Sequence, residues 1–401
     1  MELNQLKIWI VGISDREQVA LPAQLDNRLD EVSWFAGGKR HYERVKHLLP
    51  ENTRWVSVTI PLEGFYKALC RQQGTGLLFA SGDPLFYGIA VTLKRTFPAI
   101  KLEVFPFFNS LQMLAHRCQL PYGEYRVVSL TGRPWDRFDE ALVQQTAKIA
   151  LLTDAKKTPS AIARHMLMAG FDNYEFVVGE AMGGSRETIT RCPVTEAAER
   201  SFRRPNCIFL TQTHPRARQR GIPDERWKGL DGRPRMITKM PVRMTTLALM
   251  NLSEHHVLWD VGACTGSISL EAKLQEPLLN ICSFEIREEC AAIVSENCRR
   301  FGVPGISLYS GDFLEVDKEL LPAPDLVFLG GYGGKMQEVL DEIDCQLISG
   351  GIIVFNAVSD KSSHRFLKWA KEKDYPLIAE TTITVDDFHP IRILLLQKKK
   401  L

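Results

Sequence analysis

Two stretches of the chain alternate apolar, strand-like runs with segments that can form helices. From Lys7 to about Thr211 the apolar runs are KIWIVGI, GLLFASG, LEVFPF, RVVSL, KIALLT, EFVVGE and CIFLTQ. After Arg235 they are VLWDVG, ICSFEI, ISLYSG, DLVFLGG and GIIVFNAV. Buried strands separated by helices are typical of parallel sheets with right-handed crossovers. The pattern therefore predicts an α/β fold on each side of the interruption.

The interruption itself is the segment THPRARQRGIPDERWKGLDGRPR, residues 213–235, which is rich in Arg, Gly and Pro. Because it has almost no apolar periodicity, we interpret it as an interdomain linker. The predicted domains are then residues 1–212 and 236–401. Two domains fit a chain of 401 residues, because domains usually run to about 100–200 residues.

The end of the chain departs from the alternation. The runs AETTITV and IRILLLQK are separated by the short connection DDFHP. Such spacing predicts an antiparallel hairpin at the edge of the sheet. A parallel sheet that ends in a hairpin is typical of class I methyltransferases.

Charge and cysteine content exclude several function classes. Fifty Lys and Arg against 48 Asp and Glu leave a net charge of +2, which gives no global attraction to nucleic acid or to an anionic membrane. No apolar run approaches the roughly 18 residues of a membrane span, and no secretory signal precedes Lys7. Nine scattered cysteines without metal-ligand spacing indicate reduced thiols. We expect a cytoplasmic protein without disulfide or bound metal.

The sharpest local signal is VLWDVGACTGSISLEA, a strand ending at Asp260, a small-residue loop from Gly262 to Gly266 and a helix opening at Ser267 or Ile268. Glycines let a ligand approach the backbone, and the first turn of a helix offers unpaired N–H groups. The spacing G-x-G-x-x-G of dinucleotide enzymes is absent, so NAD is the weaker interpretation.

Two acidic residues extend this candidate site along the sheet. Glu285 closes the strand ICSFEI nineteen residues past Gly266, where a carboxylate can accept the ribose hydroxyls of an adenosine. Asp312 follows the next strand in YSGDF and is a candidate for holding the adenine. Each has a plainer interpretation: Asp260 as a backbone partner, Glu285 as a solvated strand end, and Gly311 with Asp312 as a turn. Their order on successive strands favours a ligand site.

The second half resembles a known family at this point. GIPDERWKGLDGRPRMITKMPVRMTTLALMNL, LWDVGACTGSISLEA, FGVPGISLYSGDFLE, PDLVFLGGYGG and GGIIVFNAV together resemble the decarboxylating corrin-precursor methyltransferase domain. The first half resembles the tetrapyrrole methylase family through GGKRHYE, ASGDPLFYGIA, VSLTGRP, LLTDAKKTPSAIA and GEAMGGSRETITR. The order of the halves resembles that of the fused C(5,15)-methyltransferases of cobalamin synthesis.

The resemblance implies an N-terminal class III methyltransferase of two α/β lobes and a C-terminal class I, Rossmann-like methyltransferase. Both would use S-adenosylmethionine on a tetrapyrrole, the first at ring position 5 and the second at position 15 with loss of carbon dioxide from the ring C acetate. Catalysis would consist mainly of alignment and exclusion of water. The family also suggests a homo-oligomer.

The resemblance also implies cofactor-binding residues. In the first half they are Gly82 and Asp83, although Asp83 and Pro84 also form a plain helix start as N-cap and N1. In the second half the cofactor-binding residues are Thr238, Gly262, Ala263, Cys264, Thr265, Gly266, Glu285 and Asp312.

Two positions depart from the family pattern. GISDRE, residues 12–17, stands where the family carries a GxGPG loop, and Cys264 stands where glycine is more usual. The first departure leaves a non-catalytic substrate-binding role for the N-terminal domain open. An RNA methyltransferase is a further alternative, which the lack of a basic, aromatic-interleaved surface argues against.

A tetrapyrrole carries many carboxylates, so cationic forks are expected in both clefts. The candidates for substrate contact are Arg40, Arg133, Arg235, Lys239 and Arg243, with Lys239 and Arg243 favoured because they precede the cofactor loop. His41, His116 and His389 are interpreted as polar or packing residues without a chemical role.

Overall fold

The structure is a computed structural model that describes residues 6–14, 16, 19–26, 28–233, 236–386 and 389–400. The chain forms two compact units. The first unit comprises residues 1–133, 147–163 and 174–213, and the second comprises residues 134–146, 164–173 and 214–401.

The first unit contains a parallel sheet of five strands in the order β3-β2-β4-β1-β5. Ile8 and Ile10 pack into the core on one face, and Trp9 and Val11 pack into the core on the other. This alternation along one strand explains why KIWIVGI is apolar throughout, since a parallel sheet is buried on both faces. The elements are β1 (Lys7–Ile13), α1 (Ala23–Asp26), β2 (Val32–Gly37), α2 (Lys39–Val45), β3 (Trp55–Ser57), α3 (Glu63–Leu69), β4 (Thr75–Ser81), α4 (Ile89–Thr96) and β5 (Lys101–Phe105).

A second five-stranded sheet in this unit has the order β6-β7-β10-β8-β9 and is mostly antiparallel, with only β6 and β7 parallel. Helix α5 packs Leu111 and Leu114 against Val177 and Phe209 of this sheet. Two sheets with their helices confirm the predicted pair of α/β lobes. The elements along this stretch of the chain are α5 (Ser110–Cys118), β6 (Arg126–Ser129), α6 (Asp136–Val143), β7 (Lys148–Leu152), α7 (Pro159–Met168), β8 (Tyr174–Glu180), β9 (Thr188–Pro193), α8 (Val194–Glu199) and β10 (Asn206–Gln212). Of these, α6 and the last residues of α7 belong to the second unit.

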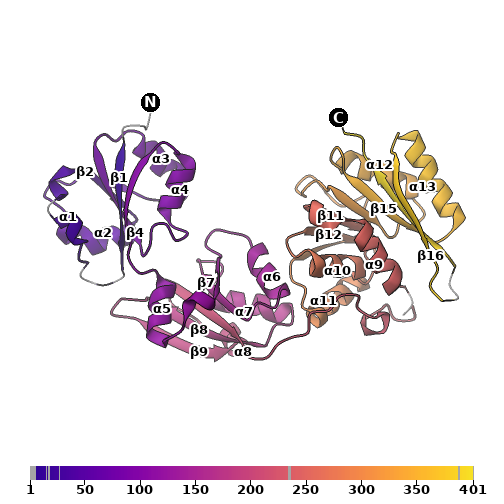
Figure 1. Cartoon of the computed structure of the whole chain (residues 1–401), viewed down its shortest axis with the longest axis horizontal. Helices are drawn as coiled ribbons and strands as arrows, with labels where there is room; N and C mark the ends of the chain where they lie inside the picture. The colour runs from indigo at the N-terminus through magenta and orange to yellow at the C-terminus, as the bar shows by residue number, and fades with distance from the viewer. Residues whose placement is uncertain are drawn as a thin grey trace. The chain divides into compact units, whose positions relative to one another are not determined.

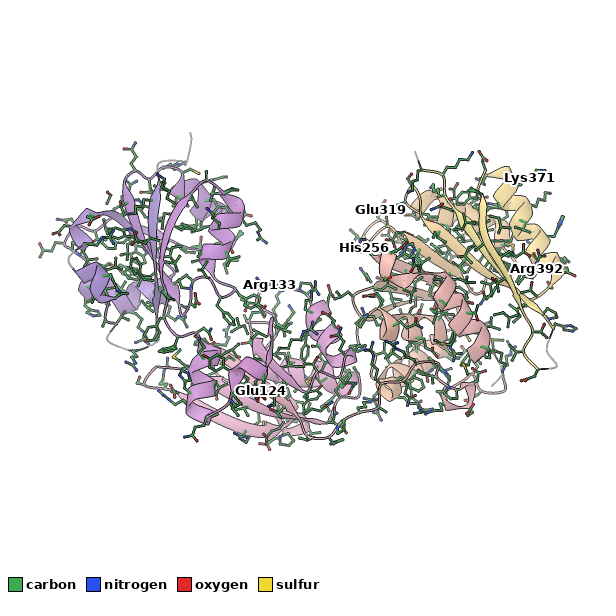
Figure 2. The ribbon with its side chains drawn as sticks, in the orientation of Figure 1. Glu124, Arg133, His256, Glu319, Lys371 and Arg392 are labelled. Carbon is green, nitrogen blue, oxygen red and sulfur yellow. The ribbon has the colours of Figure 1, made fainter. Side chains whose placement is uncertain are left out.

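The second unit is built on a seven-stranded sheet in the order β13-β12-β11-β14-β15-β17-β16 (Figure 1). The first five strands are parallel, and β17 is antiparallel to both β15 and β16. Arg392 of the hairpin, labelled in Figure 2, donates to Glu380 on the neighbouring strand. The predicted parallel sheet with a terminal hairpin is confirmed. The strands are β11 (Val257–Val261), β12 (Asn280–Glu285), β13 (Ile306–Ser310), β14 (Leu326–Leu329), β15 (Ile352–Ala357), β16 (Leu377–Ile383) and β17 (Ile391–Gln397).

Helices cover both faces of this sheet. Trp259 and Val327 share a core with α12 and α13, whereas Leu258 and Leu326 share a core with α9 and α10 on the opposite face. The carboxyl ends of the parallel strands therefore open between helical layers, where ligands of such sheets gather. The helices are α9 (Met240–Leu249), α10 (Ser267–Gln275), α11 (Glu289–Phe301), α12 (Met336–Gln346) and α13 (Asp360–Glu372).

The segment predicted as a linker differs from that expectation, because residues 214–233 pack within the second unit. Ile222 is fully buried, and Trp227 and Leu230 are nearly so. The carboxylate of Glu271 accepts the N–H of Ile222 at 2.9 Å. Three isolated apolar anchors and a buried polar partner leave no periodic pattern, which is why the sequence did not indicate packing here.

Among the described residues, no helix combines the length and apolar composition needed to cross a membrane.

Candidate functional site

The loop between β11 and α10 is tied to the end of β12 by Glu285. Oε2 of Glu285 accepts the backbone N–H of Cys264 at 2.8 Å. Oε1 accepts the backbone N–H and the guanidinium of Arg287, each at 3.0 Å. The Glu285 residue is only 3% exposed. The carboxylate thus fixes the loop backbone, and the interpretation as a solvated strand end does not apply.

Asp260 lies beneath the same loop and is 1% exposed. Its Oδ2 accepts the hydroxyl of Ser269 at 2.5 Å, and that hydroxyl lies 2.7 Å from the one on Ser283. Burial raises the pKa of Asp260 to about 6, although the hydrogen bonds with Ser269 act to lower it. Oδ1 of Asp260 and Oγ1 of Thr265 are buried without a hydrogen-bond partner among the described residues. Buried polar atoms normally find partners, so two open ones beside a cofactor-type loop fit a polar ligand.

The loop glycines are required by the protein's own backbone. Gly262 has φ +82°, and a Cβ there would lie 2.4 Å from the backbone nitrogen of Gly331. Gly266 has φ +74° and is the N-cap of α10. Cys264 is also left-handed, at φ +53°, a conformation that disfavours most side chains. Close packing of two loops, rather than ligand approach alone, therefore explains the Gly262 position.

Asp312 lies just past β13, next to the same sheet edge. Its Oδ2 pairs with Nζ of Lys335 at 2.9 Å, and Oδ1 accepts the N–H of Leu314 at 3.0 Å. The Lys335 hydrogen bond and the Leu314 N–H lower the pKa of Asp312. Gly311 donates its N–H to the carbonyl of Glu285 at 2.9 Å. The two predicted acidic residues thus sit on adjacent strand ends.

Arg243, a favoured candidate for substrate contact, has no exposed surface. Its Nε donates to Glu271 at 2.9 Å, Nη1 donates to Asp224 at 3.2 Å and to the carbonyl of Thr238, and Nη2 donates to the carbonyl of Ile222. A guanidinium enclosed by four partners has no face left for a substrate, which argues against that expectation. Its role is to hold the segment before α9 on α10.

One sequence signal did point to this burial. Arg243 precedes Leu247 by four residues, so both lie on the stripe of α9 that faces the core.

Lys239, just before the helix, is only partly enclosed and lies 3.6 Å from Asp224. It also lines a cavity of about 230 Å³ with His389 and apolar residues of the β16–β17 hairpin. Arg235 lies outside the described residues.

The first unit holds a larger cavity, of about 500 Å³. Its walls come from both sheets of the unit, and the predicted residues Gly82, Asp83 and Arg40 all line it. Gly82 has φ +60°, and a Cβ there would lie 2.8 Å from the Cα of Asn109. Gly82 therefore permits the close approach of two chain segments at the cavity wall.

The predicted helix start at Asp83 is wrong, because α4 begins at Ile89 with Gly88 as its N-cap. Oδ1 of Asp83 instead accepts the N–H of Leu85 at 2.8 Å and closes a turn. Aspartate favours both such turns and helix N-caps, so the local sequence does not distinguish the two outcomes.

Two predicted cations stand at or near this cavity. Arg40 donates to Oγ of Ser81 at 2.7 Å. Arg133, labelled in Figure 2, donates to Oγ of Ser129 at 2.8 Å, and its guanidinium lies 5.1 Å from the ring centre of Tyr87, which lines the cavity. Both arginines are exposed. Their positions are compatible with contact to an acidic ligand.

Ile13 and Ser14, from the segment GISDRE that was expected to depart from the family pattern, line the same cavity. A Cβ on Gly12 would lie 1.8 Å from the carbonyl oxygen of Gly82. Gly12 thus permits a close backbone contact with Gly82. Asp15 and Glu17 of this segment lie outside the described residues.

His41, which the sequence left without a role, also lines the cavity. Burial, with repulsion from Arg40, lowers the pKa of His41 to about 4. His116 instead packs edge-on against Phe108, with ring centres 5.3 Å apart. The described part of the chain holds no group of three or more His, Cys, Asp or Glu side chains placed to bind a metal ion.

Comparison with known proteins matches each half of the chain to a methyltransferase family. A family model for tetrapyrrole (corrin/porphyrin) methylases matches residues 7–198, and a model for a precorrin methyltransferase domain matches residues 231–387. The precorrin-6Y C(5,15)-methyltransferase (decarboxylating) of a Sinorhizobium species is 31% identical over 361 residues, covering 88% of this chain and 84% of that protein.

Two Salmonella typhimurium proteins match parts of the chain. A cobalt-precorrin-7 C(5)-methyltransferase is 30% identical over 190 residues, covering 47% of this chain and 91% of that protein. A cobalt-precorrin-6B C(15)-methyltransferase (decarboxylating) is 33% identical over 131 residues, covering 33% of this chain and 67% of that protein. With two candidate sites in regions that two methyltransferase models match, the chain is a methyltransferase and belongs to the family of precorrin-6Y C(5,15)-methyltransferases (decarboxylating).

Proposed function

We propose that this chain methylates a corrin precursor, precorrin-6Y or its cobalt form, at ring positions 5 and 15 and removes carbon dioxide from the ring C acetate. The observation that carries the proposal is the presence of two separate candidate sites, each in a region matched by a different methylase model. The first unit would act at position 5, and the second at position 15 with decarboxylation. Both reactions would draw on S-adenosylmethionine.

In the second unit, the proposed cofactor site is the loop between β11 and α10 with the ends of β12 and β13. The open Oδ1 of Asp260 and Oγ1 of Thr265 fit the polar groups of a methionine moiety. Oε1 of Glu285 already accepts two N–H groups of Arg287, but Oε2 accepts only that of Cys264. A ribose hydroxyl can therefore be added at Oε2, which has a second lone pair. Asp312 and the loop residues around Cys264 would flank the adenine.

In the first unit, the proposed site is the cavity of about 500 Å³. Its volume lies within the roughly 300–1,000 Å³ of typical ligand pockets. Gly82 and Asp83 supply backbone at one wall, and Arg40 supplies a cation for a substrate carboxylate.

When bound, S-adenosylmethionine supplies an electrophilic methyl group on a cationic sulfur. The residues of this chain would then orient the ring carbon toward that methyl group and exclude water from it. Carboxylates of the ring would be held by Arg40 and Arg133 in the first unit and by Lys239 in the second. No side-chain nucleophile is required by this chemistry.

Mass spectrometry of the product tests the proposal. The purified full-length chain would be incubated with S-adenosylmethionine and with precorrin-6Y, prepared with and without cobalt. We expect one of the two forms to gain two methyl groups and to lose one carbon dioxide. If neither form gains a methyl group, the proposed function is wrong.

A further inference from the structure

Three polar side chains meet on one wall of the first unit's cavity. Ser81 ends β4, and Arg40 and His41 lie in the first turn of α2. Nη2 of Arg40 donates to Oγ of Ser81 at 2.7 Å, and Nε2 of His41 lies 2.9 Å from the same oxygen. All three residues line the cavity.

The tautomer of His41 follows from its other nitrogen. The backbone N–H of Gly38 donates to Nδ1 of His41 at 3.2 Å, so Nδ1 carries a lone pair and no proton. Burial and the nearby Arg40 keep the pKa of His41 at about 4, so the ring is neutral near pH 7. A neutral imidazole has one N–H, which must then be on Nε2. His41 is therefore a donor to Ser81.

Ser81 is left with an unused proton. Its oxygen has two lone pairs, and the N–H groups of Arg40 and His41 occupy both. No acceptor for the Ser81 hydroxyl occurs in the described part of the chain. The hydroxyl proton is thus free to be donated to a group in the cavity, and two donors on the oxygen polarise it for that purpose.

The charged side chains around Ser81 indicate which kind of group can accept its hydroxyl proton. Arg40 and Arg44 both line the cavity, and the one carboxylate among the described lining residues, that of Asp83, is engaged by the N–H of Leu85. A wall with two arginines and a fixed hydroxyl donor suits an anionic oxygen.

We propose that Ser81 binds a carboxylate in the first unit's cavity as a hydrogen-bond donor, and that His41 is the positioning residue that directs its proton. The inference rests on the proposed function, because both ligands of the reaction carry carboxylates. One source is an acidic side chain of the tetrapyrrole, and the other is the methionine carboxylate of the cofactor.

The test uses the full-length chain with Ser81→Ala and Ser81→Thr. A hydrogen bond to a charged acceptor is worth enough to change affinity about 10- to 100-fold. We expect Ser81→Ala to raise the KM for precorrin-6Y in position-5 methylation by that factor with kcat less affected, and Ser81→Thr, which keeps a hydroxyl, to restore most of it. Ser110→Ala is the matched control, since Ser110 lines the same cavity with its hydroxyl directed at the Cys207 thiol, and a smaller effect is expected.

The affinity for S-adenosylhomocysteine, measured by calorimetry, distinguishes a carboxylate of the tetrapyrrole from that of the cofactor. If Ser81→Ala raises KM but leaves this affinity unchanged, the carboxylate belongs to the tetrapyrrole. If the affinity falls about 10-fold or more, it belongs to the cofactor. Unchanged KM and affinity, or a Ser81→Thr variant as impaired as Ser81→Ala, would overturn the proposal.

The role of His41 is tested by a double-mutant cycle. Because His41→Leu acts through Ser81, its effect on KM should largely disappear in the Ser81→Ala background. Fully additive effects would contradict a positioning role. Release of carbon dioxide by the second unit serves as an internal reference, and a wild-type chain that adds no methyl group would refute the proposed function rather than this assignment.

Discussion

Glu285 and Cys264 form the link that shapes the second unit's candidate site: Oε2 of the carboxylate accepts the backbone N–H of Cys264 at 2.8 Å. The other oxygen is held by Arg287. Cys264, which was expected to depart from the family pattern, therefore has its backbone fixed by the carboxylate that is proposed to meet the ribose. The Cys264 side chain instead points to the carbonyl of Met236, at 3.3 Å.

Replacement of Glu285 by Ala should weaken binding of S-adenosylmethionine about 10- to 100-fold, because the ribose and the loop N–H of Cys264 both lose a charged acceptor. Titration calorimetry on the full chain measures this. Glu288→Ala is the matched control, since Glu288 is an exposed acidic residue three positions further on. Equal affinities for the two variants would remove Glu285 from the site.

Asp260 should make stability depend on pH in an unusual direction. Its pKa is about 6 in the folded chain, above the ordinary 3.8. Below pH 3.8 the carboxyl is protonated in both the folded and the unfolded state, so it does not change the free energy of unfolding with pH. As pH rises to 6 the unfolded state ionises first, so the free energy of unfolding falls, by about 3 kcal/mol once pH exceeds 6.

Asp260→Asn removes this titration while keeping a polar group beside Ser269. We expect the variant to gain about 3 kcal/mol relative to the wild type between pH 3.5 and pH 7. Urea unfolding at several pH values measures the difference. A difference that does not vary with pH would show that Asp260 ionises normally in the folded chain.

Arg243→Met should lower the free energy of unfolding by about 3–5 kcal/mol, since it leaves the buried carboxylate of Glu271 without its cation. A Glu271→Leu substitution added to it should recover part of the loss. Chemical denaturation followed by Trp fluorescence measures the loss, and because both units contain tryptophans, the transition that shifts in the variant is the one to compare. Arg220→Met, at an exposed arginine within residues 214–233, should change stability by no more than about 0.5 kcal/mol. Equal stability of both arginine variants would contradict a structural role for Arg243.

Periodicity predicted the α/β class and most strands, but the predicted runs do not include β2, β3 or β9. Strands such as Lys7–Ile13 are apolar at every position because helices cover both faces, and the short connection between β16 and β17 forces an antiparallel pair. The loop from Gly262 to Gly266 was also predicted, since its glycines and the strand before it are contiguous in sequence.

Long-range polar contacts could not be predicted in the same way. Burial of Arg243 depends on Glu271, and the orientation of Ser81 depends on His41, in each case across a separation that no local pattern encodes. The packing of residues 214–233 rests on single anchors such as Ile222 and Trp227, which give no period. These features become visible only when the chain is folded.

The measurement that tests the account most directly is the product mass obtained with Gly82→Ala. At φ +60°, with 2.8 Å to the Cα of Asn109, a Cβ at this position should distort the first unit's cavity and leave the second unit intact. The wild type should add two methyl groups and release carbon dioxide, whereas the variant should add one methyl group and still release carbon dioxide. A variant that folds and still adds both methyl groups would contradict catalysis in the first unit and leave it a substrate-binding module.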